Sequence, residues 1–317
     1  LFELQYLARV RPPPHEAQIA LEREFFDPLA ALRSASSAHQ HERWWMAPAA
    51  LELVARSLDR NCFAVVDGFL EPSEMRRLRA DAQHLFLSGR MQRGAVDQGG
   101  SYWGADLEEE FSNLAQVPMK WTAFGNHKLF VGDGDASAPG VGLLPKMTDA
   151  LVSRLKGVVR PSGSLPAGVA ERLRAADLRE HVMVASYRGS QRGRYLRHTD
   201  IGRNAVLTAL YYLNHDWTEA DGGQLRIYHP GHASTEVRYD ALPVGNRLLL
   251  FWSNEDCPHE VLSTQRDRYA MTVWYRSASD LVDGRQEAVD NLVRHLHPVA
   301  PLTVEQALLR AGAAPRI

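Results

Sequence analysis

The chain has 317 residues, enough for one large domain with a sizeable buried core. Hydrophobic residues make up 45% and charged residues 23%, and these ordinary values for a globular protein exclude wholesale disorder. The formal net charge of -2 gives no electrostatic reason to expect nucleic acid or an anionic membrane as a partner.

Two cysteines, Cys62 and Cys257, are too few for a disulfide framework or a cysteine-built zinc module. They favour a reducing intracellular compartment, the cytoplasm or the nucleus. No long apolar run occurs, so the sequence predicts no membrane-spanning helix. The chain begins at Leu1 rather than Met, which leaves its targeting open, and no motif indicates the oligomeric state.

Residues 1–48 are predicted to be an irregular extension with helical content. The run Pro12–Pro14 interrupts the chain, and a helix is expected from Ala20 to Leu32. No motif indicates a function for this extension.

A helix, a buried strand and a second helix are predicted next. Apolar residues recur at helical spacing from Ala49 to Arg60, and Cys62–Asp67 has the composition of a buried strand. The second helix is expected to start near Pro72, because Glu71 and Glu74 would then lie favourably in its first turn.

Residues 89–140 are rich in Gly, Asp and Ser and carry aromatic clusters, a composition typical of long loops beside short strands. Loops of this length are commonly functional, so we expect a lid or a binding loop here. Helices are predicted from Leu143 to Leu155 and, after a flexible connection, through Ala176.

Short apolar and aromatic stretches separated by Gly, Asn, Asp and Pro clusters fill the chain from His181 to Ser277. This spacing predicts a closed double-sheet barrel of the jelly-roll or cupin kind. The expected strands are Val182–Tyr187, Tyr195–Thr199, Ala205–Leu213, Gln224–Tyr228, Thr235–Tyr239, Arg247–Trp252, His259–Leu262 and Tyr269–Tyr275.

The predicted fold class is therefore α+β, mainly β, with a double-stranded β-helix core supported by N-terminal helices. The core is expected at about residues 181–279, within a main domain of residues 49–279. Residues 280–317 are predicted to be a helical tail without an interpretable motif.

A candidate metal site begins with His198 and Asp200. On a strand, residues two apart project from the same face, so the imidazole and the carboxylate could reach one metal ion. In a chain with 13 His this pair alone is a weak signal. His259 is the candidate third ligand, with a surface turn residue as the alternative interpretation. Two imidazoles and one carboxylate form the facial set of non-haem Fe(II) oxygenases, which leaves positions for a 2-oxo acid and O2.

Arg268 heads an expected strand one short hairpin beyond His259. A dicarboxylate held at its oxo-acid end needs its distal carboxylate bound at depth, and a planar guanidinium offers two parallel donors for it. A lone Arg at a strand start is more often a solvated charge. The joint arrangement with the three candidate ligands is what favours a cosubstrate site.

Six ordered segments resemble the catalytic domain of the hypoxia-inducible-factor type prolyl 4-hydroxylases, within the Fe(II)/2-oxoglutarate-dependent dioxygenase superfamily. They are Tyr195–Asp200, Leu210–Trp217, Gly222–Tyr228, Leu250–Ser253, Pro258–Val261 and Arg268–Tyr275. The similarity covers roughly residues 181–279 and extends more weakly over 49–90. Collagen-type relatives usually place a lysine at the cosubstrate position, so Arg268 favours the oxygen-sensor type.

This resemblance implies C4 hydroxylation of a proline in another protein, with Fe(II), 2-oxoglutarate, O2 and L-ascorbate. By position, it implies that His198, Asp200 and His259 bind the iron. It also implies that Arg268 pairs with the distal carboxylate of 2-oxoglutarate, with Tyr212 donating to the same group. The catalytic set is expected to be the three ligands and Arg268.

Four further residues match positions around the cosubstrate, the metal or the substrate mouth. They are Tyr187, Tyr195, Leu225 and Trp274. For the aromatic residues and for Leu225, packing in the core is the alternative interpretation.

The target protein is not indicated, because the loop after Asp200 is shorter than in animal members and residues 89–140 match poorly. Two alternatives stay open: an oxygenase for a free amino acid or another small molecule, and a non-catalytic binding module on the same fold. An open groove at residues 89–140 would favour a peptide, and a closed lid a small molecule. A nucleic-acid demethylase is disfavoured by the charge balance and by the lack of a basic, aromatic stripe.

Overall fold

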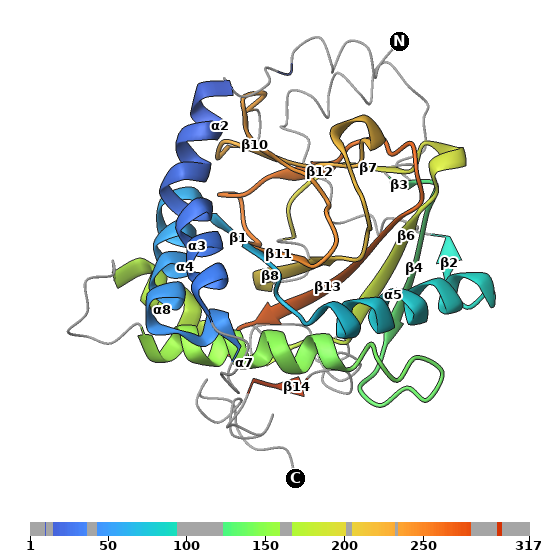
Figure 1. Ribbon diagram of the computed structural model, residues 1–317, viewed down its shortest axis with the longest axis horizontal. Coiled ribbons are helices and arrows are strands. Elements are labelled where there is room, and N and C mark those ends of the chain that lie inside the picture. Colours follow the sequence, from blue (N-terminus) through green and yellow to red (C-terminus); the bar gives the residue numbers. More distant parts are fainter. Residues whose placement is uncertain are drawn as a thin grey trace.

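Two antiparallel sheets packed face to face form the centre of the protein (Figure 1). The computed structural model describes residue 10 and residues 15–36, 43–93, 123–158, 167–200, 205–231, 234–279 and 297–299. Within these ranges no helix is long and apolar enough to cross a membrane.

The larger sheet carries the helices on its outer face. Its strands are β1 (Phe63–Asp67), β2 (Gln92–Arg93), β4 (Asn126–Val131), β5 (Leu178–Arg179), β6 (Val182–Tyr187), β8 (Ala205–Tyr212), β11 (Arg247–Trp252), β13 (Arg268–Arg276) and β14 (His297–Pro298). The order is β1-β11-β8-β13-β6-β4-β2, with β5 paired to β13 and β14 to β5.

The smaller sheet closes the barrel on the other side. It consists of β3 (Ala123–Phe124), β7 (Arg194–His198), β9 (Leu225–Tyr228), β10 (Val237–Ala241) and β12 (His259–Val261). These strands lie in the order β10-β9-β12-β7-β3.

The described α-helices all lie before β5 in the chain, with β1 to β4 placed between them. They are α2 (His15–Leu21), the π-helical turn η1 (Glu22–Phe26), α3 (Asp27–Ala35), α4 (Pro48–Asn61), α5 (Pro72–Leu87), α7 (Leu143–Val158) and α8 (Ala167–Ala175). Short 3-10 turns lie at η2 (Trp44–Met46), η4 (Gly189–Gln191) and η6 (Glu219–Asp221).

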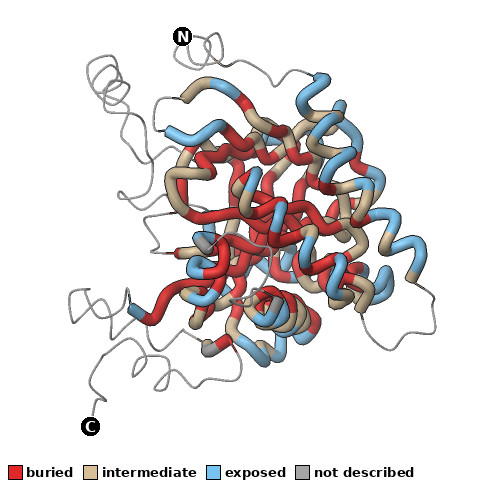
Figure 2. The backbone as a smooth tube through the Cα atoms, turned by 90° about the vertical axis from the view of Figure 1, so that its left-hand side faces the viewer, coloured by how far each residue is buried: buried red, intermediate tan, exposed pale blue. Residues whose placement is uncertain are grey.

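Alternation along the strands produces two separate hydrophobic clusters. In β1, Phe63 and Val65 face the smaller sheet, while Ala64 and Val66 face the helices. Since successive side chains point to opposite faces, a strand covered on both sides must be apolar throughout. Figure 2 shows the result: the strands at the centre are buried, and exposed residues lie along the outer faces of the helices.

The helix starts follow from local chemistry. Helices α4 and α5 both begin with a proline, whose missing N–H costs nothing at the first helical position. At α5 the side chains of Glu71 and Glu74 complete a capping box. The predicted start of this helix near Pro72 is therefore confirmed.

The described part of residues 1–48 closes the gap between the edges of the two sheets. Phe26 contacts Phe63 of β1 and Tyr239 of β10, with ring centroids 6.2 and 5.5 Å apart. The Gln18 side chain accepts a hydrogen bond from the backbone N–H of Asp240 in β10. This segment covers an edge strand that would otherwise expose unpaired backbone groups.

The predicted double-stranded β-helix core is confirmed, with strand ends that differ from the prediction by at most two residues. In the predicted helical tail, residues 297–298 form strand β14 instead, and the backbone N–H of Val299 donates to Asp177. Pro298 has no N–H for a helix interior but is tolerated at a sheet edge. The other residues of 280–317, and 94–122 of the expected loop, lie outside the described residues.

Candidate active site

The three candidate metal ligands come from two neighbouring strands of the smaller sheet. His198 ends β7, Asp200 follows it by two residues, and His259 begins β12. Strands β7 and β12 are antiparallel, and their register sets His259 directly opposite His198. Directly opposite residues project from the same face, so the two imidazoles turn into the barrel together.

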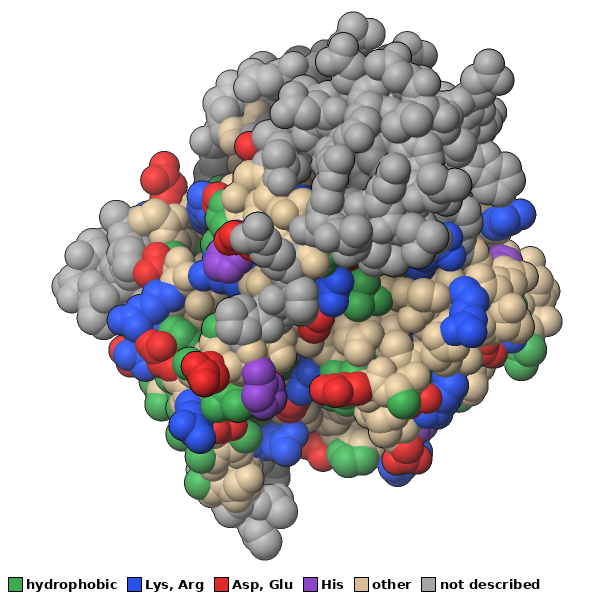
Figure 3. Space-filling view, turned by 90° about the horizontal axis from the view of Figure 1, so that it is seen from above, with side chains coloured by type: hydrophobic (Ala, Val, Ile, Leu, Met, Phe, Trp, Pro, Cys, Tyr) green, Lys and Arg blue, Asp and Glu red, His purple; other side chains and the backbone are tan. Residues whose placement is uncertain are grey.

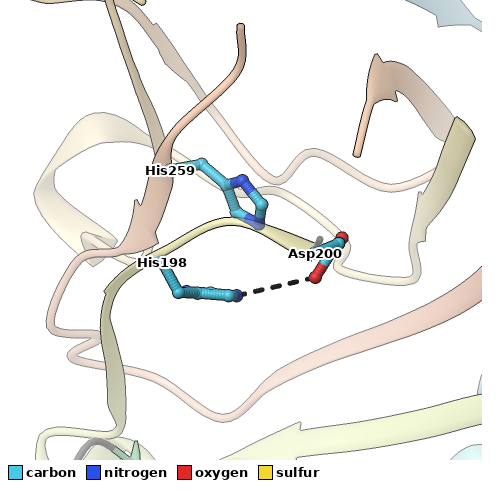
Figure 4. A group of neighbouring side chains, drawn as sticks. All are labelled: His198, Asp200 and His259. Atoms are coloured by element: carbon cyan, nitrogen blue, oxygen red, sulfur yellow. Dashed lines mark ion pairs between the residues drawn. The ribbon is translucent and has the colours of Figure 1, made fainter. Parts of the chain in front are cut away.

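The ligand atoms of His198, Asp200 and His259 all lie within 4.8 Å of one another. The Nε2 atom of His198 is 3.9 Å from Oδ1 of Asp200, and Figure 4 shows both rings and the carboxylate converging on one point. Among the described residues this is the one group with metal-ligand geometry. It has the composition of a facial Fe(II) site.

Backbone carbonyls fix the tautomer of both histidines. Nδ1 of His198 lies 2.8 Å from the carbonyl oxygen of Leu196, and Nδ1 of His259 lies 2.9 Å from that of Cys257. A carbonyl oxygen only accepts, so each Nδ1 carries the proton and each Nε2 keeps its lone pair. This is the form in which histidine binds a metal.

Asp200 is held by a hydroxyl from the larger sheet. The Thr208 hydroxyl donates to Oδ2 of Asp200 over 2.7 Å and lies 2.8 Å from the Ser253 hydroxyl. Burial disfavours the ionised carboxylate, but His259, His198 and the Thr208 hydrogen bond outweigh it and lower the pKa of Asp200. Asp200 is therefore available as an anionic ligand.

Arg268 is buried, with 1% of its surface exposed. Its guanidinium lies over the rings of Tyr187 and Tyr212, 4.8 and 5.0 Å from their centroids, and Nε donates to the carbonyl oxygen of Gly223. Gly223 has φ of 70°, and a Cβ there would lie 3.0 Å from Cδ of Arg268. The glycine thus leaves room for the arginine.

Two donors at this end of the cavity are unused. Nη2 of Arg268 is buried and has no hydrogen-bond partner among the described residues, and the Tyr212 hydroxyl, which accepts from Arg268, keeps its own proton to donate. Burial raises the pKa of Tyr212 to about 12, despite the opposing charge of Arg268, so the phenol keeps its proton. A cationic donor beside a neutral hydroxyl donor suits the carboxylate of a bound diacid.

A cavity of about 350 Å³ joins the metal-ligand group to Arg268. Its lining includes the other predicted site residues Tyr187, Tyr195, Leu225 and Trp274. Tyr212 is not among the lining residues, but its ring contacts the guanidinium of Arg268, which is. The structure thus brings all nine predicted site residues to one place, while their roles stay predictions.

Several lining residues were not predicted from the sequence, among them Asn126, Lys128, Thr208 and Thr272. Thr208 lies four residues before Tyr212 on β8, so both side chains project from the same face of the strand. This spacing could have identified Thr208. Asn126 lies in the segment that carried no recognisable motif. Its strand β4 had no alternation strong enough to fix a register.

A family model described as the 2OG-Fe(II) oxygenase superfamily matches residues 182–276. The chain is 29% identical over 234 residues to Egl nine homolog 1 of Homo sapiens, which covers 73% of this chain and 47% of that protein. It is 30% identical over 235 residues to the hypoxia-inducible factor prolyl hydroxylase of Caenorhabditis elegans, which covers 72% of this chain and 28% of that protein.

A solved prolyl hydroxylase from Trichoplax adhaerens, in complex with a peptide fragment of the hypoxia inducible factor oxygen degradation domain, is similar in structure. The TM-score is 0.57 at 26% sequence identity, and the match covers 77% of this chain and 99% of the other. These two curated relatives match most of this chain, but the chain spans only about half of their length or less. The resemblance seen in the sequence is confirmed at the level of the domain.

Proposed function

Since residues 182–276 form a 2OG-Fe(II) oxygenase domain, we propose that the protein hydroxylates C4 of a proline in another protein. One observation carries this proposal: the group of His198, Asp200 and His259 and the buried Arg268 line the same cavity. Domains of this family use Fe(II), 2-oxoglutarate and O2.

His198, Asp200 and His259 would hold the iron from one side, which leaves the cavity side of the metal open to ligands. When bound, the iron supplies the redox chemistry that couples decarboxylation of 2-oxoglutarate to hydroxylation. The protein contributes ligand orientation through the Leu196 and Cys257 carbonyls and charge through Asp200.

Arg268 and Tyr212 would hold the distal carboxylate of 2-oxoglutarate. Their unused donors would form charge-assisted hydrogen bonds to this carboxylate. Because these donors are already buried, binding would not require the protein to desolvate them. Leu225, Phe251 and Val261 line the same cavity and exclude water from it. Tyr187 would contact the oxo-acid end of the cosubstrate, as the resemblance implies.

A proline in a protein is the substrate that the relatives favour, since the Trichoplax adhaerens enzyme was solved with a peptide. Trp274 and Tyr195 supply apolar ring surface for a pyrrolidine ring on the cavity wall. We place the protein with the intracellular oxygen-sensor type, in the cytoplasm or the nucleus, where L-ascorbate helps to keep iron reduced. The free cysteines Cys62 and Cys257 accord with a reducing compartment.

Nucleic acid is not part of this proposal. On the described part of the face in Figure 3, Lys and Arg side chains alternate with Asp and Glu and form no basic stripe. A nucleic-acid partner would favour clustered positive charge.

Purified protein supplied with Fe(II), 2-oxoglutarate and O2 should form succinate, and an Asp200→Ala variant should form none. Incubation with native lysate followed by mass spectrometry should find one oxygen atom added to a proline of a captured protein. Succinate that depends on a free amino acid, with no modified protein, would instead establish a small-molecule oxygenase. Equal succinate output from Asp200→Ala would refute the metal assignment.

A further inference from the structure

Asn126 lies in one row with Tyr187 and Arg268 across three strands of the larger sheet. In the pairing of β4 with β6, Asn126 is opposite Tyr187, and in the pairing of β13 with β6, Arg268 is opposite Tyr187. Directly opposite residues share a face of the sheet. All three side chains line the cavity, so this row forms part of its wall.

The side chain of Asn126 hydrogen-bonds to that of Tyr187, its neighbour across the strand pair. Burial raises the pKa of Tyr187, with Asp200 acting in the same direction, while Arg268 and the Asn126 hydrogen bond oppose the rise. The Oδ1 atom of Asn126 has no hydrogen-bond partner among the described residues, so the bond runs through the amide nitrogen, which only donates. Asn126 is therefore the donor and Tyr187 the acceptor.

This direction determines where the Tyr187 proton can go. A tyrosine hydroxyl has one proton, and an oxygen that accepts from Asn126 must direct that proton to another acceptor. The guanidinium of Arg268, 4.8 Å from the ring centroid, has only donors and cannot receive it. An anionic ligand in the cavity can.

A second observation shows that the side-chain oxygen of Asn126 faces the open cavity rather than another protein group. The residue is 2% exposed, and its Oδ1 atom has no hydrogen-bond partner among the described residues. An unpaired buried acceptor is costly to keep, and an ordered water in the cavity can pair with this one, since 2-oxoglutarate offers only acceptors. This oxygen belongs to a side chain of the cavity wall.

We propose that Asn126 is a positioning residue for the cosubstrate, which acts by directing the Tyr187 hydroxyl toward the oxo-acid end of 2-oxoglutarate. This inference rests on the proposed function and adds a residue to it. Asn126 stabilises the bound cosubstrate only through Tyr187, so its contribution disappears when the tyrosine hydroxyl is removed.

A double-mutant cycle tests this coupling. The affinity for 2-oxoglutarate is measured by calorimetry with Mn(II) in place of Fe(II), so that no turnover occurs. Asn126→Leu removes the donor but keeps a side chain of similar volume, and Asn126→Ala removes the side chain beyond Cβ; neither adds a charge to the cavity. Each should weaken binding about tenfold in the otherwise native protein, because a hydrogen bond to a charged group is lost. In a Tyr187→Phe background each should weaken it by less than about twofold.

His127→Gln is the matched control, since His127 neighbours Asn126 on β4 but faces away from the cavity. It should leave the affinity unchanged. Equal losses in both Tyr187 backgrounds would mean that Asn126 acts only on the fold, and unaltered affinity in the Asn126 variants would mean that it has no role. Either result overturns this inference alone if the native protein binds 2-oxoglutarate and forms succinate, whereas a native protein that does neither overturns the proposed function.

Discussion

His198 and His259 lie directly opposite each other on the paired strands β7 and β12, with ring centroids 4.4 Å apart. The register of this strand pair therefore determines the spacing of two candidate ligands. A slip of one residue would turn one imidazole out of the barrel. The group of ligands is a product of sheet pairing and not of a local motif, which makes it sensitive to changes that alter the pairing.

Replacing Arg268 by alanine should weaken 2-oxoglutarate binding by about 10- to 100-fold, because charge-assisted hydrogen bonds worth about 1.5–3 kcal/mol are lost. Arg268→Lys should recover only part of the affinity, since an ammonium is a point charge without a planar pair of donors. Calorimetry with Mn(II) measures both. Arg266→Ala, two residues earlier and more exposed, is the control and should bind normally. Normal binding by Arg268→Ala would exclude it as the carboxylate partner.

Thr208→Val should weaken metal binding about 10- to 100-fold while it leaves the three ligands in place. The substitution removes the hydroxyl that donates to Asp200 and contacts Ser253 but keeps the side-chain volume. Equilibrium dialysis with Fe(II) under anaerobic conditions measures the affinity. Thr235→Val, on the chain before β10 and away from the cavity lining, serves as the control. An unchanged iron affinity in Thr208→Val would show that Asp200 needs no support from this hydroxyl.

Gly223→Ala should impair 2-oxoglutarate binding, because the new Cβ would lie 3.0 Å from Cδ of Arg268. Gly134→Ala is a closely matched control: φ is also positive there, but a Cβ would meet nothing within 4 Å. Both substitutions carry the backbone cost of a left-handed residue, on the order of 1 kcal/mol. Thermal unfolding should therefore respond to both and cosubstrate affinity only to Gly223→Ala. Similar affinity losses in the two variants would point to backbone strain rather than to contact with Arg268.

Glu74→Gln should destabilise the protein by about 1 kcal/mol at neutral pH through loss of the bidentate ion pair with Arg43, since a glutamine can still accept from the Glu71 backbone N–H. Burial raises the pKa of Glu74, but the Arg43 hydrogen bonds, the Glu71 backbone N–H and the Arg43 charge lower it below its usual 4.5. The ionised form therefore stabilises the fold above that value, and this contribution is lost as pH falls through the lower folded pKa.

The difference in unfolding free energy between Glu74→Gln and the native protein should consequently shrink as the pH falls below the usual pKa of 4.5 and through the lower folded pKa. Denaturant unfolding at several pH values measures it. Glu52→Gln, at an exposed position of α4, should show little change at any pH. A difference that stayed constant with pH would exclude the charge of Glu74 as its source.

The strands could be predicted because each is buried in a regular way. Strand β6 was expected at Val182–Tyr187 and lies there, since its apolar run is bounded by residues that break pairing. The ends of β13 moved outward by one residue on each side, to Arg268 and Arg276. Both arginines are buried and hydrogen-bond to distant segments, Arg268 to Gly223 and Arg276 to Glu180. No local sequence pattern reveals these partners.

Site residues could be predicted where their type is chemically unusual on a strand. They could not be predicted where a common residue reaches the site only because of how its strand pairs with others. His198, Asp200, His259 and Arg268 are of the first kind. Thr208 and Asn126 are of the second kind, because their contacts cross between β7 and β8 or between β4 and β6. The sheet order β8-β13-β6-β4 that brings them together follows from long-range pairing alone.

The most direct test of the account is the iron content of the protein after anaerobic dialysis against Fe(II), measured for the native chain and for His198→Ala, Asp200→Ala and His259→Ala. The account predicts one iron per native chain and a large loss in each variant, with an exposed-site control, His84→Ala, unchanged. A native chain without iron, or full iron in all three variants, would contradict it.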